Sequence, residues 1–412
     1  MEKLDILMKT DVVLVFVITI GILMQKKEIN NLLVSIVKAI MGYNIIVFGS
    51  NLAISTLGVL SLTIRRSLHV FDIIPSNETM ISIVGYSYGK NALFIMIIAM
   101  VINIIIAKLT PLKYIFINGY YILYMSGMLA LLINDKPTYS LIILSGIYLG
   151  FFMSFLPFIT APFIKKITGR EDIGLAHFGS VACLIGGMTS LIFKNSKEEK
   201  KEKKKSSFMR DSSVLMAISM FFIYLLAIIN IENGFLYDFT GETNKLYIAF
   251  KYSINFTVAF YLIILGVRMM TDEILFAFKG IGEKIIKDAK PAMDSAVFFT
   301  YNPEIVMLGF VTSLVGGIVT LMVQIKIKSP VVVPPVTTHL FSGGLAGIFG
   351  YVVGKRKGAL LSAFVHGIII TVIPIFLLPL LRPHIGLMRT CYADSDFGIL
   401  AIIFTFLRKL LF

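Results

Sequence analysis

The sequence predicts an all-α polytopic membrane protein, and three observations support this prediction. Of its 412 residues, 57% are hydrophobic and only 15% are charged, whereas soluble globular domains carry about 25% charged residues. The mean hydropathy is +0.86. Apolar stretches long enough to cross a bilayer, which takes roughly 20 residues, recur along the whole chain. This composition excludes a water-soluble enzyme, a disordered chain and a nucleic-acid-binding domain.

The apolar stretches predict about 10–11 transmembrane helices. They cover residues 12–24, 31–63, 92–109, 114–133, 138–164, 213–231, 246–270, 304–325, 331–353, 358–381 and 397–412. Several are interrupted by Gly, Pro, Ser or Asn, which predicts broken helices at places where protein or a water-filled cavity covers the backbone. Two semi-polar segments, 64–91 and 271–303, are predicted to be re-entrant hairpins or amphipathic segments.

A basic segment divides the chain into an N-terminal half (1–193), a linker (194–212) and a C-terminal half (213–412). Between Lys194 and Arg210 lie seven Lys, one Arg and three Glu, a net charge of +5. The positive-inside rule predicts that this linker is cytoplasmic. We interpret it as a flexible topology anchor; a docking loop for a partner is the alternative.

The two halves contain similar residues in the same order, at offsets of 216 to 221 residues. The matched pairs are Glu78 and Asp294, Gly127 and Gly347, Lys136 and Lys357, and Gly146 and Gly367. Repeated halves with broken segments at corresponding positions are typical of transporters, whose substrate site lies near the midplane between the repeats. The sequence leaves open whether the repeats are inverted.

Four polar residues have apolar neighbours: Asn77, Glu78, His177 and Asp294. A charged side chain at the bilayer centre costs about 2.5–3.5 kcal/mol, so such residues usually face a cavity and have a function. Glu78 and Asp294 occupy matching repeat positions and are predicted to bind substrate; a location in interfacial water is the alternative. For His177, ligand contact and a packed, hydrogen-bonded position remain equally open.

Carboxylates and amides are suited to sugar-like ligands, because each can make several hydrogen bonds to hydroxyls. An anionic ligand would instead need donors such as His177, Asn77 or the backbone N–H groups of a broken helix end. The sequence contains no motif of an intramembrane enzyme, no metal-binding cluster and no activated phosphoryl-accepting residue. We therefore expect no catalytic residue, no metal and no cofactor.

The chain resembles the membrane component (enzyme IIC) of the ascorbate-type phosphoenolpyruvate-dependent phosphotransferase system (PTS). The most specific resemblance lies between Gly266 and Gly309, in the sequence GVRMMTDEILFAFKGIGEKIIKDAKPAMDSAVFFTYNPEIVMLG. Further similar segments are IIPSNE at 73–78, the stretch ending at His177, PVTTHLFSGGLAGIFG at 335–350 and DSDFG at 394–398. Together these segments are spread from residue 73 to residue 398, so the resemblance implies that both halves form one enzyme IIC domain.

The resemblance implies a homodimeric permease in a bacterial plasma membrane, built from inverted repeats. It implies a core domain with two re-entrant hairpins, which carries substrate inward by an elevator-like movement against a scaffold domain. Phosphorylation of the substrate would then come from a separate enzyme IIB, itself phosphorylated by enzyme IIA.

Substrate contacts of the family, transferred by position, fall on Asn77, Glu78, Tyr120, Tyr124, His177, Phe178 and Asp294. Two positions depart from the family pattern. The family's Thr-Gly-His is Asn118-Gly119-Tyr120 here, and the glutamine common four residues later is Tyr124. These changes leave L-ascorbate, another sugar, a sugar acid or a polyol as possible substrates.

Three other functions compete with a PTS permease. An ion-coupled secondary transporter of a sugar or organic anion would share the fold but need no phosphoryl donor. A receptor or scaffold would not require the buried carboxylates. An integral-membrane enzyme is disfavoured by the missing motifs.

Overall fold

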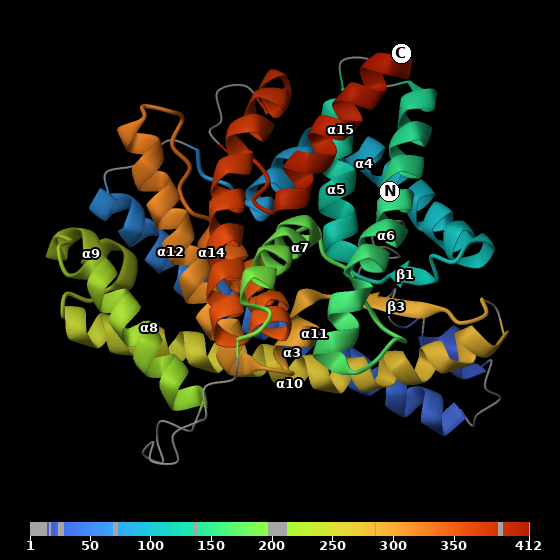
Figure 1. Cartoon of the computed structure of the whole chain (residues 1–412), viewed down its shortest axis with the longest axis horizontal. Helices are drawn as coiled ribbons and strands as arrows, with labels where there is room; N and C mark the ends of the chain where they lie inside the picture. Colours follow the sequence, from blue (N-terminus) through green and yellow to red (C-terminus); the bar gives the residue numbers. More distant parts are fainter. Residues whose placement is uncertain are drawn as a thin grey trace.

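The computed structural model describes residues 15, 18–23, 29–68, 73–134, 138–196, 212–284, 286–385 and 390–411. These parts of the chain are mainly helical (Figure 1). The longer helices are α3 (Ile29–Leu68), α4 (Asn77–Leu109), α5 (Gly119–Leu132), α6 (Tyr139–Thr168), α7 (Ser180–Thr189), α8 (Ser212–Ile228), α9 (Asn233–Thr240), α10 (Lys245–Lys284), α12 (Pro303–Lys326), α14 (Gly344–Ile385) and α15 (Ser395–Leu411). Short helical pieces are η1 (Ser190–Phe193), α11 (Ser295–Phe299), α13 (Val336–Thr338) and the π-helix η3 (His339–Gly343).

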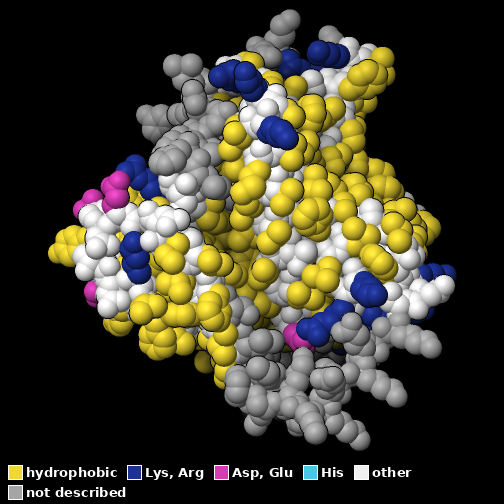
Figure 2. Space-filling view, turned by 60° about the vertical axis from the view of Figure 1, so that its left-hand side comes forward, with side chains coloured by type: hydrophobic (Ala, Val, Ile, Leu, Met, Phe, Trp, Pro, Cys, Tyr) yellow, Lys and Arg dark blue, Asp and Glu magenta, His cyan; other side chains and the backbone are white. Residues whose placement is uncertain are grey.

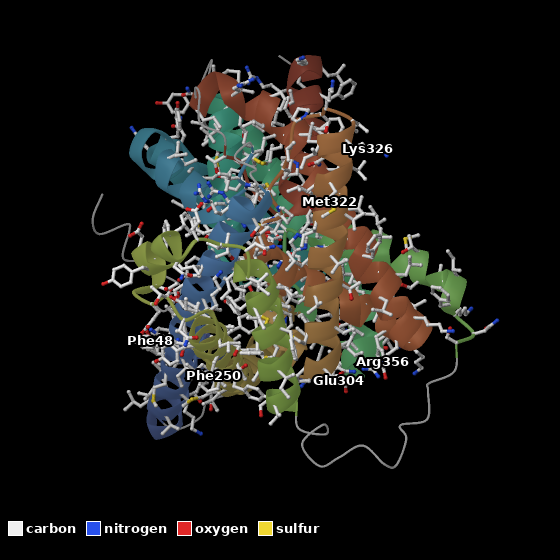
Figure 3. The ribbon with its side chains drawn as sticks, turned by 90° about the vertical axis from the view of Figure 1, so that its left-hand side faces the viewer. Phe48, Phe250, Glu304, Met322, Lys326 and Arg356 are labelled. Carbon is white, nitrogen blue, oxygen red and sulfur yellow. The ribbon has the colours of Figure 1, made fainter. Side chains whose placement is uncertain are left out.

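Within the described residues, six helices are long and apolar enough to cross a membrane. They cover Leu32–Ser67, Tyr88–Leu109, Tyr139–Thr168, Asn233–Ile263, Pro303–Lys326 and Val336–Pro383. Hydrophobic side chains cover much of the visible surface, and several Lys and Arg side chains lie near its top and bottom (Figure 2). Helix α12 follows this division, with Glu304 near its lower end and Lys326 near its upper end (Figure 3). These features confirm a multi-pass α-helical membrane protein.

Local sequence signals explain where helices begin and end. Thr138 precedes α6, and its hydroxyl accepts a hydrogen bond from the Leu141 backbone N–H at 3.3 Å, which satisfies one free donor of the first turn. Gly169 ends the same helix with a φ of +71°, a left-handed conformation that glycine adopts without steric cost. Helix α14 has a sharp kink at Gly354 and Lys355, so it forms two arms. The apolar stretch 331–353 therefore corresponds to the π-helix η3 and the first arm of α14. The stretch 358–381 corresponds to the second arm.

The two semi-polar segments, predicted to be re-entrant hairpins or amphipathic segments, each contain non-helical residues that lead into a helix. In the first, Ile73 forms a β-bridge, residues 74–76 are outside helices and strands, and α4 then continues from Asn77 to Leu109 as one helix. In the second, residues up to Lys284 belong to α10, and a strand and the short helix α11 follow. Both segments combine an extended stretch with the start of a helix, a pattern for which apolar periodicity gives no signal.

A small parallel sheet, which the sequence did not predict, lies inside the helical protein. It comprises β1 (Tyr114–Phe116), β3 (Lys290–Met293) and β2 (Gly174–Leu175), in the order β1-β3-β2. A separate parallel bridge joins Ile73 to Val332. Because these extended pieces pair across the two halves of the chain, they bring several helix starts together.

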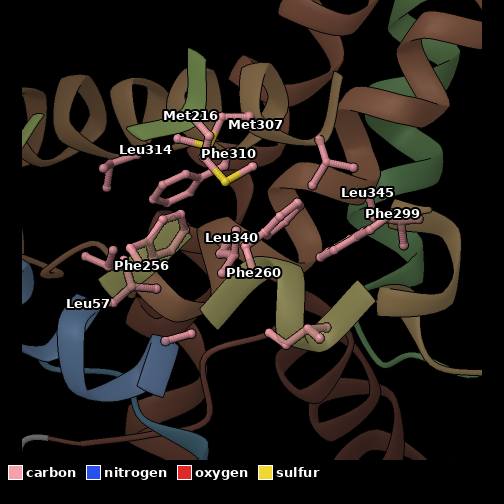
Figure 4. Close-up of a cluster of buried hydrophobic side chains, with 14 of the residues drawn as sticks. Leu57, Met216, Phe256, Phe260, Phe299, Met307, Phe310, Leu314, Leu340 and Leu345 are labelled. Carbon is pink, nitrogen blue, oxygen red and sulfur yellow. The ribbon is translucent and has the colours of Figure 1, made fainter. Parts of the chain in front are cut away.

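The helices form two packing groups. Helices α3, α8 and α10 pack on one another, while α4, α5, α6, α7, α12, α14 and α15 form a second, larger group. Figure 1 shows α3 and α10 running along the lower side, with α12, α14, α5 and α6 above them. A buried cluster joins the groups, in which Phe256 of α10 stacks on Phe310 of α12 at 5.9 Å between ring centroids (Figure 4).

Candidate substrate-binding site

A cavity of about 480 Å³ lies between the two packing groups. Helix α3 contributes Tyr43, Val47, Asn51, Leu57 and Gly58 to one wall. The opposite wall contains polar side chains and tyrosines from the larger group and its connections: Asn77, Asn118, Tyr120, Tyr121, Tyr124, Asp294, Thr337, Thr338 and Asp394. The cavity is therefore apolar and aromatic with a few polar groups, as is usual for small-molecule sites.

Three of these polar residues stand where an extended segment passes into a helix. Asn77 follows residues 73–76 and begins α4. Asn118 follows β1 and caps α5, with its Oδ1 3.4 Å from the backbone N of Tyr121. Asp294 follows β3 and caps α11, with its Oδ1 2.9 Å from the backbone N of Ala296. Asn and Asp are favoured at such positions because their side chains satisfy free N–H groups of the first turn, and here the same side chains reach the cavity.

Asp294 is joined to the other half of the chain through Asn118. The Asn118 amide Nδ2 donates to Asp294 Oδ2 and also to the carbonyl oxygen of Ala176, 3.2 Å away. The Ser295 hydroxyl lies 3.1 Å from Asp294 Oδ1. The half-buried carboxylate therefore has several donors within the protein and still faces the cavity.

Asp394, in the connection between α14 and α15, is a second carboxylate of the cavity. Its Oδ2 accepts from Asn77 Nδ2 at 2.9 Å and from the Tyr121 hydroxyl at 3.3 Å, and its Oδ1 accepts from the Ser342 hydroxyl. Burial raises the pKa of Asp394 to about 6, while hydrogen bonds from Ser342, Asn77 and Tyr121 oppose this rise. Asn77 is fixed in turn, because its Oδ1 accepts from the Ala393 backbone N–H at 2.9 Å.

His177 lies behind Tyr121, in the connection between β2 and α7, and is fully buried. Its Nε2 is 2.8 Å from the Tyr121 hydroxyl, and its Nδ1 accepts from the Gly179 backbone N–H at 2.8 Å. Burial lowers the pKa of His177 to about 4, with a smaller opposing effect from Asp294. The imidazole is therefore neutral at physiological pH.

Tyrosines connect the two walls of the cavity. The hydroxyls of Tyr43 on α3 and Tyr120 on α5 are 2.6 Å apart. The ring of Tyr124 lies 6.5 Å from that of Tyr120 and 6.1 Å from that of Tyr121. Such rings can pack against the apolar face of a sugar while their hydroxyls make hydrogen bonds.

The structure brings most of the residues predicted from sequence to one place. Asn77, Tyr120, Tyr124 and Asp294 line the cavity. His177 and Phe178 are buried behind it, and Phe178 stacks on Phe116 at 5.3 Å. Glu78 belongs to the first turn of α4, but its side chain is outside the described residues.

Sequence reasoning did not assign site roles to Asn118, Tyr121, Ser342 and Asp394. Asp394 belongs to the segment 394–398 that carried part of the resemblance, and Asn118 was noted only as a departure from the family pattern. A usable signal was the position of both residues immediately before an apolar helix. Ser342 and Tyr121 lie within helical segments and give no comparable signal.

The site can bind hydroxyl groups, and its described residues do not form a metal centre. No cluster of three or more His, Cys, Asp or Glu side chains occurs within the described part of the chain. Asp294, Asp394 and the tyrosine hydroxyls offer oxygen acceptors, and Asn77 keeps one amide N–H beyond its bond to Asp394. This set of groups is appropriate for a small polyhydroxylated molecule.

Comparison with known proteins agrees with this geometry. The model of the family described as "PTS system sugar-specific permease component" matches residues 5–406. The chain is also similar to the "Ascorbate-specific PTS system EIIC component" of Mycoplasma pneumoniae, with 23% identity over 258 residues. The matched region covers 55% of this chain and 39% of that relative, so the chain aligns with well under half of the relative's length.

The family match spans almost all of the described helices, including every segment that lines the cavity. The segment 394–398, which supplies Asp394, lies inside it as well. The predicted resemblance to enzyme IIC is therefore confirmed, and the chain belongs to the family of sugar-specific permease components of the PTS.

Proposed function

We propose that this chain is the permease subunit that binds L-ascorbate, or a related sugar or sugar acid, in the cavity and carries it inward. The observation that carries the proposal is a single cavity with Asn77, Asn118, Asp294 and Asp394 in one wall. A ring of hydroxyls can be bound by these groups from several directions. The relative from Mycoplasma pneumoniae is named as ascorbate-specific, which makes L-ascorbate the first substrate to test.

We propose further that the chain consists of two inverted structural repeats. Two cross-half strand contacts support this: Tyr114 pairs with Lys290, and Ile73 pairs with Val332, both parallel. Two close helix crossings also correspond. A Cβ on Gly146 of α6 would approach the Ile98 side chain of α4 to 2.4 Å, and one on Gly367 of α14 would approach the Ser313 carbonyl oxygen of α12 to 2.0 Å.

The proposed movement is elevator-like, with the larger packing group as the core domain and α3, α8 and α10 as part of the scaffold. The location of the cavity at the boundary of the two groups supports this assignment. A substrate held mainly by the larger group would travel with it when that group moves against α3.

The proposed partners are a second copy of the chain, forming a homodimer, and a separate phosphorylated enzyme IIB, with enzyme IIA upstream. The proposed location is a bacterial plasma membrane. The phosphoryl group would come from the separate enzyme IIB, because the sequence of this chain offers no activated phosphoryl acceptor. Phosphorylation would take place at the cytoplasmic side of the membrane.

The test is uptake of a labelled panel, comprising L-ascorbate, hexoses, hexitols and sugar acids, by the protein in proteoliposomes. Each sugar is measured with and without phosphorylated enzyme IIB enclosed, and the product is scored for phosphate. We expect phosphorylated product only with enzyme IIB, and no uptake by Asp294→Ala. Tyr148→Phe is the matched control. The buried Tyr148 hydroxyl donates a hydrogen bond to the carbonyl oxygen of Leu400, and this residue does not line the cavity. Accumulation of unmodified sugar without enzyme IIB would favour the ion-coupled transporter.

A further inference from the structure

Two buried amide side chains occupy equivalent places in the two halves of the chain. Asn103 lies in the last two turns of α4, and Gln324 lies in the last turn of α12. Gln324 follows Asn103 by 221 residues, the same offset as between Gly146 and Gly367. An amide carries both donors and an acceptor, and buried polar groups need partners, so the partners of these two amides show what they hold.

Asn103 completes the open edge of the small sheet. Its Oδ1 accepts from the Phe116 backbone N–H at 3.0 Å. Its Nδ2 donates to the Tyr114 carbonyl oxygen at 3.0 Å and to the Ser154 hydroxyl of α6 at 2.7 Å. Strand β1 is an edge strand, and its backbone groups at 113 and 117 bond β3, so those at 114 and 116 point away from β3. The amide satisfies backbone groups that would be costly to leave unpaired inside a membrane protein.

Gln324 makes the corresponding contacts in the C-terminal half. Its Oε1 accepts from the Val332 backbone N–H at 2.9 Å, and its Nε2 donates to the Thr371 carbonyl oxygen of α14 at 3.0 Å. The residues on either side of Val332 exchange backbone hydrogen bonds with Ile73, both at 2.9 Å. The Val332 N–H therefore faces away from Ile73, and Gln324 supplies its acceptor.

Each amide thus supports a contact between the two halves. Strand β1, held by Asn103, pairs with β3, which leads directly into Asp294. The segment held by Gln324 bridges to Ile73, and the chain then leads into Asn77 at the start of α4. Asp294 and Asn77 both line the cavity. The amide of one half is therefore linked to the cavity residue of the opposite half.

We propose that Asn103 and Gln324 are equivalent positioning residues for substrate binding. Asn103 sets the position of Asp294, and Gln324 sets the position of Asn77, each through one contact between extended backbone segments of the two halves. The inference rests on the proposed function, because its effect on affinity needs a sugar that contacts Asp294 and Asn77. The backbone contacts that it invokes do not depend on the sugar.

Double-mutant cycles test the proposal, with binding of the panel sugar that the wild type transports to the purified full-length protein as the readout. Gln324→Met removes the amide and keeps the side-chain length. We expect it to weaken binding roughly three- to tenfold, the range for one neutral hydrogen bond. In the Asn77→Ala background the same change should cost no more than about twofold, whereas in the Asp294→Ala background it should cost its full amount. Asn103→Leu should show the opposite preference.

Thr320→Val is the matched control on α12, because the buried Thr320 hydroxyl donates to the Gly316 carbonyl oxygen of its own helix. It should leave binding within about twofold of wild type. Gln324→Glu is the conservative variant, because a neutral carboxyl group keeps the shape, one donor and one acceptor. At mildly acidic pH it should bind sugar more tightly than Gln324→Met. Equal losses from Gln324→Met in both alanine backgrounds would mean that the amide only stabilises the fold, and would overturn the inference.

Hydrogen exchange measured by mass spectrometry provides a readout that needs no substrate. Gln324→Met should speed exchange several-fold in peptides covering Ile73 and 331–333 and leave β1 and β3 unchanged, and Asn103→Leu should do the reverse. Where an apolar variant does not fold, Gln324→Asn or Asn103→Ser replaces it, since each is too short to reach its backbone partner.

The two readouts separate failure of the inference from failure of the proposed function. Faster exchange in both pairs of segments alike, or in neither, would overturn the inference while leaving the proposed function intact. If no panel sugar binds to the wild type, the proposed function fails, and the proposed role of both amides in binding fails with it.

Discussion

Asp294 and Asn118 show how single residues join the two halves of the chain at the cavity. Each follows a short strand and caps the next helix, and the strands β1 and β3 are neighbours in one sheet. The Asn118 amide therefore reaches the Asp294 carboxylate without leaving its own helix cap. The pair positions a carboxylate at the wall of the cavity and links strand pairing directly to the site.

The pair makes a sharp prediction about charge. In Asp294→Asn the new amide must place a donor group against either the Asn118 amide or the Ala296 N–H. We therefore expect this variant to bind sugar almost as weakly as Asp294→Ala, roughly 10- to 150-fold below wild type. The double variant Asn118→Asp/Asp294→Asn exchanges donor and acceptor and should recover part of the loss, measured by calorimetry.

The control is Asp238→Asn on α9, an exposed carboxylate outside the cavity, which should bind sugar like wild type. Wild-type affinity in Asp294→Asn would mean that binding needs neither the charge nor the second acceptor oxygen of this carboxylate.

At the scale of elements, close helix crossings determine whether the polar residues at the N-termini of different helices can lie next to one another. Helices α12 and α14 approach at Gly316, Gly317 and Gly367, where an added Cβ would meet backbone or side-chain atoms within 3.0 Å. Gly367 faces the Ser313 carbonyl oxygen at only 2.0 Å from such a Cβ. Backbone atoms cannot move aside as a flexible side chain would, so the crossing requires glycine.

We expect Gly367→Ala to lower the free energy of unfolding by about 1–3 kcal/mol, the usual cost of overpacking. Thermal unfolding in detergent provides the measurement. Gly234→Ala on α9 is the matched control, because a Cβ there meets no atom within 4 Å. Equal melting temperatures for the two variants would contradict the close crossing.

At the scale of the whole molecule, the two ends of α12 lie at opposite ends of the largely hydrophobic surface that would face the lipid. Glu304 forms an ion pair with Arg356 at 2.7 Å, near the kink of α14, and Lys326 lies at the far end (Figure 3). A Cβ on Gly354, at this kink, would approach Phe193 within 2.8 Å. The Arg356 side therefore adjoins the segment leading into the basic linker, for which the sequence predicts a cytoplasmic location; residues 197–211 of that linker lie outside the described residues.

This arrangement predicts opposite labelling of two single-cysteine variants with a membrane-impermeant maleimide. Lys326→Cys should react in intact cells, whereas Arg356→Cys should react only after permeabilisation. The native cysteines, Cys183 and Cys391, are buried, so the unmodified protein is the blank. The reverse pattern would invert the proposed topology.

The proposed movement of the core against the scaffold can be tested at Tyr43 and Tyr120. The hydrogen bond between their hydroxyls links α3 to α5 at the cavity. Movement of the larger helix group against α3, α8 and α10 must therefore break this hydrogen bond. A reducible bifunctional thiol reagent joining Tyr43→Cys to Tyr120→Cys should abolish uptake, and reduction should restore it. Because both tyrosines line the cavity, each variant is compared with its own untreated form, and the treated single-cysteine variants should lose much less transport than the treated double variant. Undiminished transport by the cross-linked protein would exclude movement between these helices.

The sequence by itself determined the class of the protein and most of its helices. Apolar length is a local property, so stretches such as 138–164 and 304–325 correspond closely to α6 and α12. Residue composition and the enzyme IIC segments were sufficient to identify the family. The sequence also selected Asn77 and Asp294, because a polar group among apolar neighbours is conspicuous and usually has a purpose.

Only the tertiary structure decided which polar groups share the cavity. The sheet strands have two to four residues each, too few to produce a periodic pattern, and their pairing depends on contacts between distant segments. Asn77 and Asp394 are 317 residues apart in sequence and 2.9 Å apart in space. The directions of hydrogen bonds around His177 likewise depend on Gly179 and Tyr121 together. The donor and acceptor roles in a hydrogen bond can be assigned only when all polar atoms around it are known. Those atoms come together only in the folded chain.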